Sequence, residues 1–222
     1  MKRASLLLFV FLLFSCQTLP VIDSPLLLKN EKSFICPSPF LNKKYRMVHA
    51  IETRVGGKTQ SSIIGVTVVD PVSRSISCAI MTAEGLVLFE AESGPDKFRI
   101  SRALPPFDTE DFAKNMIEDI KLIFFMHEGK LQNRGYLHDG SKVCRYLQKK
   151  GDWIDVIESK SGDKQVNRYT SSGVLKRHVL FNKTPKNIYR RIELQAYENM
   201  DYSLLMNLIE IQPVKIQAVK RK

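Results

Sequence analysis

The sequence lacks an uncharged run long enough to cross a membrane. Near the amino terminus, residues 4–14 carry no charge and follow Lys2 and Arg3. A membrane-spanning helix needs ~20 apolar residues at ~1.5 Å each, so this run is too short to span a bilayer. A basic start followed by a short apolar run is typical of a signal peptide, which we place at residues 1–15.

Catalytic and metal-binding motifs are also missing. The sequence contains no Gly-x-Ser-x-Gly, no His-Glu-x-x-His and no phosphate-binding loop. Ser161 and Lys164 have the Ser-x-x-Lys spacing, but they fall in a polar turn between two expected strands. The histidines lie far apart, without the spacing of metal ligands: His49, His127, His138 and His178. We therefore predict no enzyme activity, no metal site and no non-covalent cofactor.

Cysteine is scarce. Besides Cys16, the chain contains Cys36, Cys78 and Cys144. In an oxidising compartment these three residues allow at most one disulfide within the chain. Cys78 and Cys144 occupy alternating positions of expected strands, so each also suits the role of a small buried apolar residue. The pairing stays open at this stage.

Acidic residues are fewer than basic ones. The formal net charge is +11. It falls to about +9 once the signal peptide, which contains Lys2 and Arg3, is cleaved off. The basic residues are spread along the chain, without a Lys/Arg block or an aromatic RNA-binding pattern, so we do not expect a nucleic-acid partner. Phospholipid headgroups or lipopolysaccharide phosphates are more natural partners for an exported protein. The alternative is a basic surface that only keeps the protein soluble.

One segment, residues 104–126, has the periodicity of a long helix. Pro105 and Pro106 end the preceding element, and Asp108 or Thr109 can cap the first free amides of the helix. The expected buried face consists of apolar residues at spacings of three and four: Phe112, Ala113, Met116, Ile117, Ile120, Ile123 and Phe124. The expected solvent face is polar: Lys114, Asn115, Glu118, Asp119 and Lys121.

The rest of the chain alternates between apolar and polar residues, which predicts half-buried strands. Expected strands before the helix are 45–55, 62–69, 75–82, 86–92 and 97–101. Expected strands after it are 136–138, 142–148, 153–159, 164–170, 174–181, 188–197 and 202–212. Turn signals such as Gly56-Gly57, Asp139-Gly140 and Ser172-Gly173 separate them. A meander this long must curl and close, or leave a mouth that the helix covers.

Two positions on these strands carry further expectations. His49 falls on the inward face of the first strand and has no identifiable catalytic partner, so we interpret it as a packed, hydrogen-bonded core histidine. The last strand has apolar residues on both faces, which predicts that both faces are buried. These residues are Leu204, Leu205, Met206, Leu208, Ile209 and Ile211.

The end of the amino-terminal apolar run, Leu13-Phe14-Ser15-Cys16, resembles the bacterial lipobox. That resemblance implies a diacylglycerol and an N-linked acyl chain on Cys16, which would hold the protein to a membrane. Gln17 is not the aspartate of an inner-membrane retention signal, so we expect the outer membrane, facing the periplasm. The alternative is a plain secretory signal with an incidental cysteine. Residues 16–42, which contain several prolines, are interpreted as the lipidated terminus and a tether.

A lipobox, a basic meander, the Leu104-Pro105-Pro106-Phe107 start of one amphipathic helix and a second meander occur in this order. This order resembles the lipoprotein-localisation fold of the LolA and LolB type over residues 43–212. The resemblance implies a half-open, curled antiparallel β-barrel, with the helix at its mouth and an apolar cavity that accepts acyl chains. We therefore expect one β domain at 43–214 and a basic tail at 215–222. The family member that inserts lipoproteins into the membrane has an apolar loop between two early strands. The corresponding turn here, at 82–85, is tight and carries a charge.

On this basis the chain is expected to be a monomeric envelope lipoprotein that binds or transfers lipid, lipopolysaccharide or lipoproteins. Residues on strand and helix faces are the candidates for lining its cavity: Val87, Phe89, Ala91, Phe98, Ile100, Ile120 and Phe124. An apolar inner face has the same sequence whether a lipid or side chains fill it. A structural or scaffold lipoprotein with a solidly packed barrel is therefore the alternative function.

Overall fold

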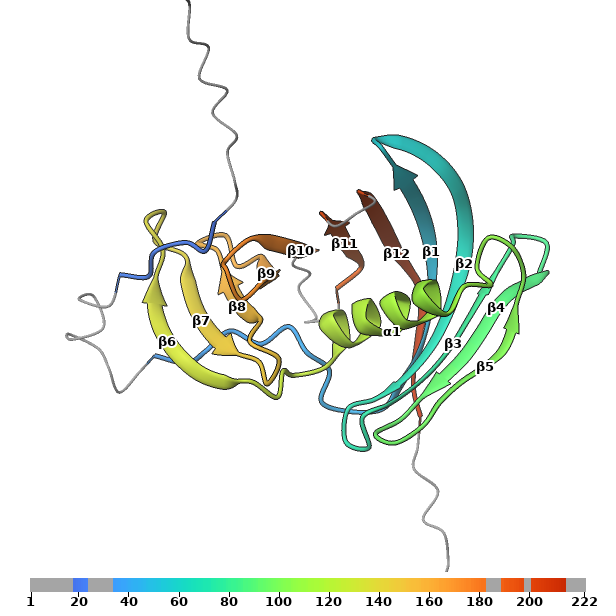
Figure 1. Cartoon of the computed structure of the whole chain (residues 1–222), viewed down its shortest axis with the longest axis horizontal. Helices are drawn as coiled ribbons and strands as arrows, with labels where there is room; N and C mark the ends of the chain where they lie inside the picture. The colour runs from blue at the N-terminus through green and yellow to red at the C-terminus, as the bar shows by residue number, and fades with distance from the viewer. Residues whose placement is uncertain (1–17, 24–33, 183–188, 198–200, 215–222) are drawn as a thin grey trace, which may run out of the picture.

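The structure, a computed structural model, describes residues 18–23, 34–182, 189–197 and 201–214. Within these ranges the chain forms one sheet of twelve strands, crossed by one helix (Figure 1). The mainly β fold with one principal helix is confirmed.

The five strands before the helix are β1 (Tyr45–Val55), β2 (Lys58–Asp70), β3 (Ser75–Met81), β4 (Val87–Ser93) and β5 (Phe98–Ala103). The helix is α1 (Glu110–Phe124). The strands after it are β6 (Lys130–Tyr136), β7 (Lys142–Leu147), β8 (Trp153–Glu158), β9 (Lys164–Tyr169), β10 (Leu175–Asn182), β11 (Arg191–Ala196) and β12 (Tyr202–Pro213).

The first and last strands pair with each other and join two meanders into one sheet. The order is β5-β4-β3-β2-β1-β12-β11-β10-β9-β8-β7-β6. Antiparallel pairing of β1 with β12 runs from Tyr45 opposite Pro213 to Val55 opposite Tyr202. Strands β5 and β6 are the edges, and they do not pair with each other in the part of the chain that the structure describes. The sheet is therefore curled but open, and α1, which connects the two edge strands, crosses it (Figure 1).

The turn signals of the sequence fall between strands. Gly56 and Gly57 join β1 to β2 with φ of 56° and 77°, a left-handed backbone that favours glycine because it has no Cβ. Short turns of this kind bring consecutive strands side by side, which is why the two meanders need no long connections.

The start of α1 follows from its sequence. The side chain of Thr109 accepts a hydrogen bond from the amide of Phe112 at 3.2 Å, so Thr109 is the cap. Glu110 and Asp111 in the first turn favour the positive end of the helix dipole. The helix is shorter than the expected 104–126, because the chain makes a separate turn before Thr109, in which the Phe107 amide donates to the Leu104 carbonyl at 2.8 Å.

The expected helix faces are largely correct, although Phe112 and Met116 of the expected buried face are only half-buried. Ala113, Ile117, Ile120, Ile123 and Phe124 are buried, as predicted. Asp119 was assigned to the solvent face, and this is wrong, since it is only 6% exposed. The carboxyl half of the helix packs within the curled sheet, so its burial is wider than the single stripe that the periodicity predicts.

Three strand expectations need correction. Strand β2 begins at Lys58, ahead of the expected 62. Strand β6 covers Lys130–Tyr136, ahead of the expected 136–138, because an exposed edge strand has little apolar alternation to reveal it. Strand β12 is not buried on both faces. Met206 is its buried residue, whereas Ile209 is 61% exposed, since the helix and core cover only one side of the sheet.

The described parts of the segment expected to be a tether lie against the sheet. Cys36 forms a disulfide with Cys144 of β7, and Cys78 is free and buried. Asp23 makes an isolated β-bridge with Tyr136 at the end of β6. Residues 1–17, with Cys16, and the tail 215–222 lie outside the described residues. The described fold thus extends to the amino-terminal side of residue 43.

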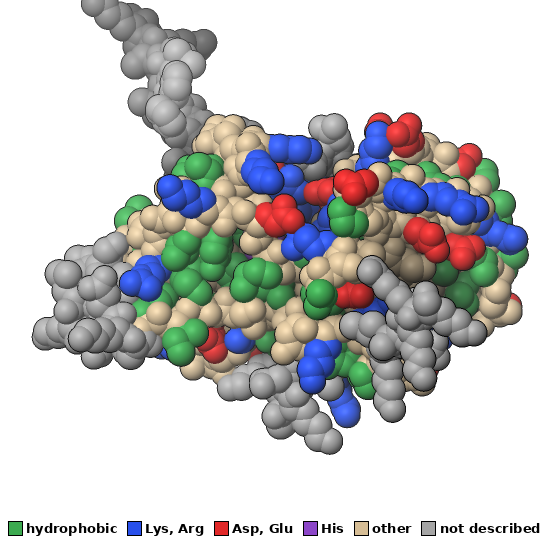
Figure 2. Space-filling view, turned by 90° about the horizontal axis from the view of Figure 1, so that it is seen from below, with side chains coloured by type: hydrophobic (Ala, Val, Ile, Leu, Met, Phe, Trp, Pro, Cys, Tyr) green, Lys and Arg blue, Asp and Glu red, His purple; other side chains and the backbone are tan. Residues whose placement is uncertain are grey.

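The surface carries both signs of charge. In Figure 2, Lys and Arg side chains are spread over the face seen from below, with Asp and Glu among them and apolar groups between. This agrees with the sequence, in which basic residues do not form a block.

Candidate functional site

An apolar cavity of about 390 Å³ lies at the carboxyl end of α1. It is partly open and is bordered by β1, the start of β9, the strands β10–β12, the last turn of the helix and the segment before β1. The lining side chains are Ser38, Pro39, Phe40, Leu41, Asn42, Tyr45, Met47, His49, Phe124, Lys164, Phe181, Tyr189, Ile192, Leu208 and Ile211. Most of these residues are aliphatic or aromatic, which suits a hydrocarbon group, while Ser38, Asn42, His49 and Lys164 add polar atoms to the lining.

An irregularity in β12 helps to shape this cavity. Opposite β1, Val48 pairs with Glu210 and His49 pairs with Leu208, so Ile209 is an extra residue in the ladder. A β-bulge of this kind reverses which residues face inward beyond it. Leu208 and Ile211 therefore both line the cavity, while Ile209 faces outward and is 61% exposed.

Residues 34–42, which we call the strap, cover the cavity from the amino-terminal side. The disulfide of Cys36 attaches the strap to β7. The Leu41 amide donates to the Phe124 carbonyl at 3.2 Å, and the ring of Phe40 stands edge-on to His127 with 4.8 Å between ring centroids. At the rim, Lys164 Nζ lies 3.5 Å from the Ser38 carbonyl. The strap is thus fixed near both of its ends and forms one wall.

His49 lies at the inner end of the cavity. It is 1% exposed, and its ring centroid is 6.3 Å from that of Phe124. Burial lowers the pKa of His49 to about 4, so the ring is neutral at pH 7. The expectation of a packed core position is confirmed. Its Nδ1, however, has no hydrogen-bond partner among the described residues, so the expected hydrogen bonding is not met at that atom.

The residues expected to line a cavity do not come together in one place. Phe124 lines the apolar cavity. Phe89, Ala91 and Ile120 are buried in the core, and Ile100 packs against it. Val87 is half-buried at the start of β4. Phe98 is 40% exposed and lines a second, polar cleft on the outer side of α1.

Sequence reasoning missed most of the actual lining, because it comes from elements far apart in the chain. The alternation in β1 did place His49 on the inward face, and the same pattern includes Tyr45 and Met47. The strap gave no such signal, because its prolines suggested an irregular tether. Ser161 and Lys164 are not assembled as a catalytic pair: Ser161 Oγ donates to Asp163 at 2.7 Å, while Lys164 is directed to the strap.

A buried polar network also went unrecognised. Arg177 Nε of β10 donates to Asp119 Oδ1 of α1 at 3.0 Å, and the Tyr202 hydroxyl of β12 donates to Asp119 Oδ2. The guanidinium of Arg177 also lies over the ring of Tyr202, 5.6 Å from its centroid. Burial raises the pKa of Asp119, and the contacts with Arg177 and Tyr202 oppose that rise. The network holds the helix to two strands and so fixes the helical wall.

This arrangement matches a known fold. The crystal structure of a LolA superfamily protein, NE2245, from Nitrosomonas europaea superposes with a TM-score of 0.54, over 80% of this chain and 89% of that chain. The chain has a LolA-like fold. Only 11% of the aligned residues are identical, so the match is one of architecture. No protein-family profile and no curated protein matches the sequence.

The LolA-like fold here has no helix that is long and apolar enough to span a membrane, within the residues described. Those residues also contain no group of three or more His, Cys, Asp and Glu side chains placed to hold a metal ion. The chemistry that the cavity itself offers is the burial of apolar groups.

Proposed function

We propose that this protein is a lipid-anchored envelope protein that binds or transfers a lipid or acylated molecule in the apolar cavity. The observation that carries this proposal is the cavity under the strap. Its volume of about 390 Å³ lies within the range of roughly 300–1,000 Å³ of small-molecule sites. Its aliphatic and aromatic lining favours a hydrocarbon chain, because burying apolar surface contributes about 25 cal/mol per Å².

The anchor belongs to the same proposal. A diacylglycerol and an N-acyl chain on Cys16 would keep the cavity close to membrane lipid, and more than one acyl chain is needed for stable anchoring. The fold resembles that of a LolA superfamily protein, which supports an envelope location. The outer membrane, a monomeric state and a lipid, lipopolysaccharide or lipoprotein ligand remain parts of the proposal.

A scaffold lipoprotein is the second candidate. The observation that favours it is the strap, which a disulfide and a hydrogen bond hold across the cavity. Several side chains expected to line a cavity are instead packed in the core. In a scaffold the cavity would stay empty.

The test uses a chain of residues 17–222, which keeps all twelve strands, the helix and the strap. Native mass spectrometry and organic extraction would detect a copurifying lipid, and a fluorescent fatty acid would measure uptake. Ile211→Trp places a large ring in the cavity. Ile209→Trp is the matched control, because it adds the same ring two residues away on the outer face.

A carrier should copurify with lipid or take up the fatty acid, and Ile211→Trp should remove this binding while Ile209→Trp keeps it. An empty wild-type protein that also takes up no fatty acid would contradict the proposal and favour the scaffold. Equal binding by the two tryptophan variants would place the ligand elsewhere.

A further inference from the structure

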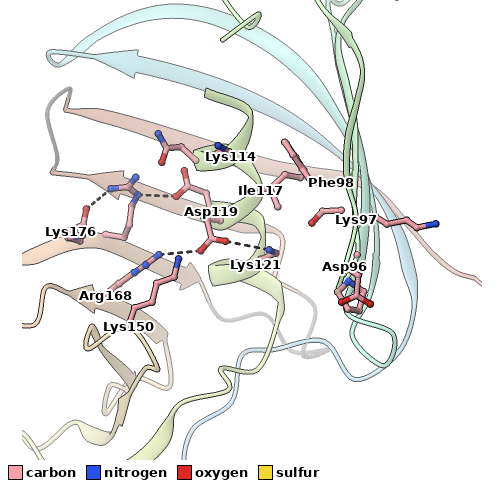
Figure 3. A pocket seen from close by; sticks show the side chains of 16 residues that line it. Asp96, Lys97, Phe98, Lys114, Ile117, Asp119, Lys121, Lys150, Arg168 and Lys176 are labelled. Carbon is pink, nitrogen blue, oxygen red and sulfur yellow. Dashed lines mark hydrogen bonds and ion pairs between the residues drawn. The ribbon is translucent and has the colours of Figure 1, made fainter. Parts of the chain in front are cut away.

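A second cavity, separate from the apolar one, lies on the outer side of α1. It has a volume of about 620 Å³ and shares no lining residue with the apolar cavity. Four regions meet around it: the β4–β5 turn, the outer face of α1, the turn before β8, and strands β9 and β10 (Figure 3). We call it the basic cleft.

The basic cleft gathers charges that are otherwise spread over the surface. Its positively charged lining residues are Lys97, Lys114, Lys121, Lys150, Arg168, Lys176 and Arg177. Its negatively charged lining residues are Asp96, Glu118 and Asp119. Asp119 is already neutralised by its buried contact with Arg177. Lys114 is likewise paired with Glu110, outside the lining. The lining still has more basic than acidic residues, and an excess of one sign of charge in a cleft concentrates ions of the opposite sign.

Arg168 of β9 is held in a fixed orientation at this cleft. Its Nε and Nη2 atoms each lie 2.9 Å from Asp152 Oδ2, in the turn before β8. That contact occupies one edge of the guanidinium and leaves Nη1 directed toward α1, where it lies 3.6 Å from Glu118 Oε2. A planar guanidinium oriented in advance is well suited to bind a phosphate oxygen.

Two ammonium groups line the cleft together with Arg168. Lys121 Nζ is 3.4 Å from Glu118 Oε1, so the Glu118 carboxylate bridges Lys121 and Arg168. Lys150 lines the same cleft as Arg168 (Figure 3), and it has no ion-pair partner within the described residues. The Glu118 side chain is 52% exposed, and such long, solvated ion pairs are weak. A more highly charged anion could therefore replace the Glu118 carboxylate.

We propose that the basic cleft binds a phosphate group through Arg168, Lys121 and Lys150. The volume exceeds that of a single phosphate, and the exposed ring of Phe98 provides an apolar wall beside the cations. The ligand is therefore a phosphate ester or a polyphosphate, supplied either by a lipid headgroup or by a free phosphate compound. This site does not depend on occupancy of the apolar cavity.

The chain of residues 17–222 is again the protein to test, since it contains the whole basic cleft. Binding of inorganic pyrophosphate, measured by calorimetry, tests whether the cleft binds a free phosphate compound. Vesicles of phosphatidylglycerol report an anionic lipid headgroup, and vesicles of zwitterionic phosphatidylcholine, which have no net charge, are the comparison. Binding of pyrophosphate points to the first source, and binding of phosphatidylglycerol vesicles alone points to the second. Either result supports the phosphate site if the variants below respond as expected.

Lys121→Gln/Lys150→Gln should weaken binding of the active probe by roughly tenfold, because two charge-assisted contacts are lost. Lys58→Gln/Lys130→Gln removes the same charge from exposed positions on β2 and β6, outside the cleft, and should change binding by less than about twofold. Glu118→Gln removes the competing carboxylate and should strengthen binding several-fold. If Glu118 had only a structural role, its replacement would not strengthen binding.

The proposal is overturned if neither probe binds. It is also overturned if the two lysine double variants weaken binding equally, because net charge alone would then explain the effect. Ile211→Trp, which fills the apolar cavity, should leave pyrophosphate or vesicle binding unchanged. Failure of the fatty-acid test and failure of the phosphate test are therefore separate results.

Discussion

Asp119 is the residue that ties α1 to the far strands. Its carboxylate contacts Arg177 and Tyr202, and the side chains of Asp119 and Arg177 are 8% and 7% exposed. Asp119→Ala should lower the free energy of unfolding by roughly 3 kcal/mol, because a buried cation loses its counter-charge. Asn115→Ala, at an exposed position of the same helix, should change it by less than about 0.5 kcal/mol. Urea unfolding of both variants checks this, and equal midpoints would mean that the network does not hold the helix.

His49 makes stability depend on pH. Its folded pKa of about 4 lies below the unfolded value of 6.5, so the unfolded chain binds more protons between these values. The contribution is fully present above pH 6.5 and is lost as the pH falls toward 4. Between pH 7 and pH 5, wild type should lose about 2 kcal/mol more than His49→Leu. Unfolding curves at both pH values measure the difference, and parallel losses in the two proteins would contradict a buried neutral ring.

At the scale of residues, the sequence predicted local features better than long-range partners. The cap at Thr109 and the apolar spacing of α1 depend on neighbours within a few positions, and both are confirmed. The burial of Asp119 could not be predicted in this way. Its partners Arg177 and Tyr202 are 58 and 83 positions away, and only the curled sheet brings them to the helix.

The strap is the element whose attachment can be removed most cleanly. The disulfide between Cys36 and Cys144 closes a loop of sequence separation 108. Cys36→Ser/Cys144→Ser should lower the free energy of unfolding by roughly 2–4 kcal/mol, because the unfolded chain gains freedom. Reduced wild type should match this variant, and Cys78→Ala should still respond to reductant. If reductant leaves the unfolding curve of wild type unchanged, the strap is not held by this bond.

Among the elements, those with a buried face were the easiest to predict. The strands from β7 to β10 begin within one residue of the expected positions, because their apolar residues alternate. Strand β6 lies at an edge and exposes Lys130, Leu131, Gln132 and Asn133, so no alternation marked it. The cavity is harder still, since β1, β10–β12, α1 and the strap each contribute a few side chains.

At the scale of the whole molecule, pairing of β1 with β12 decides where the two cavities lie. It joins the two meanders and leaves the sheet open between β5 and β6. The helix then crosses the opening, with the apolar cavity at its carboxyl end and the basic cleft along its outer face. The apolar cavity and the basic cleft thus both lie beside the same helix, one with apolar and one with basic side chains.

The proposed anchor at Cys16 would determine which surface this molecule meets. If Cys16 carries acyl chains, wild type should sediment with membranes and stay there in high salt, because acyl insertion is not screened as the attraction between a basic protein and anionic lipid is. Cys16→Ser should remain an unprocessed precursor or appear in the soluble fraction after the salt wash. Cys78→Ala, which changes a buried free cysteine, should fractionate like wild type. Metabolic labelling with palmitate should mark wild type and Cys78→Ala alone. A wild-type protein released by salt without label would remove the anchor and leave only charge to bring the protein to a membrane.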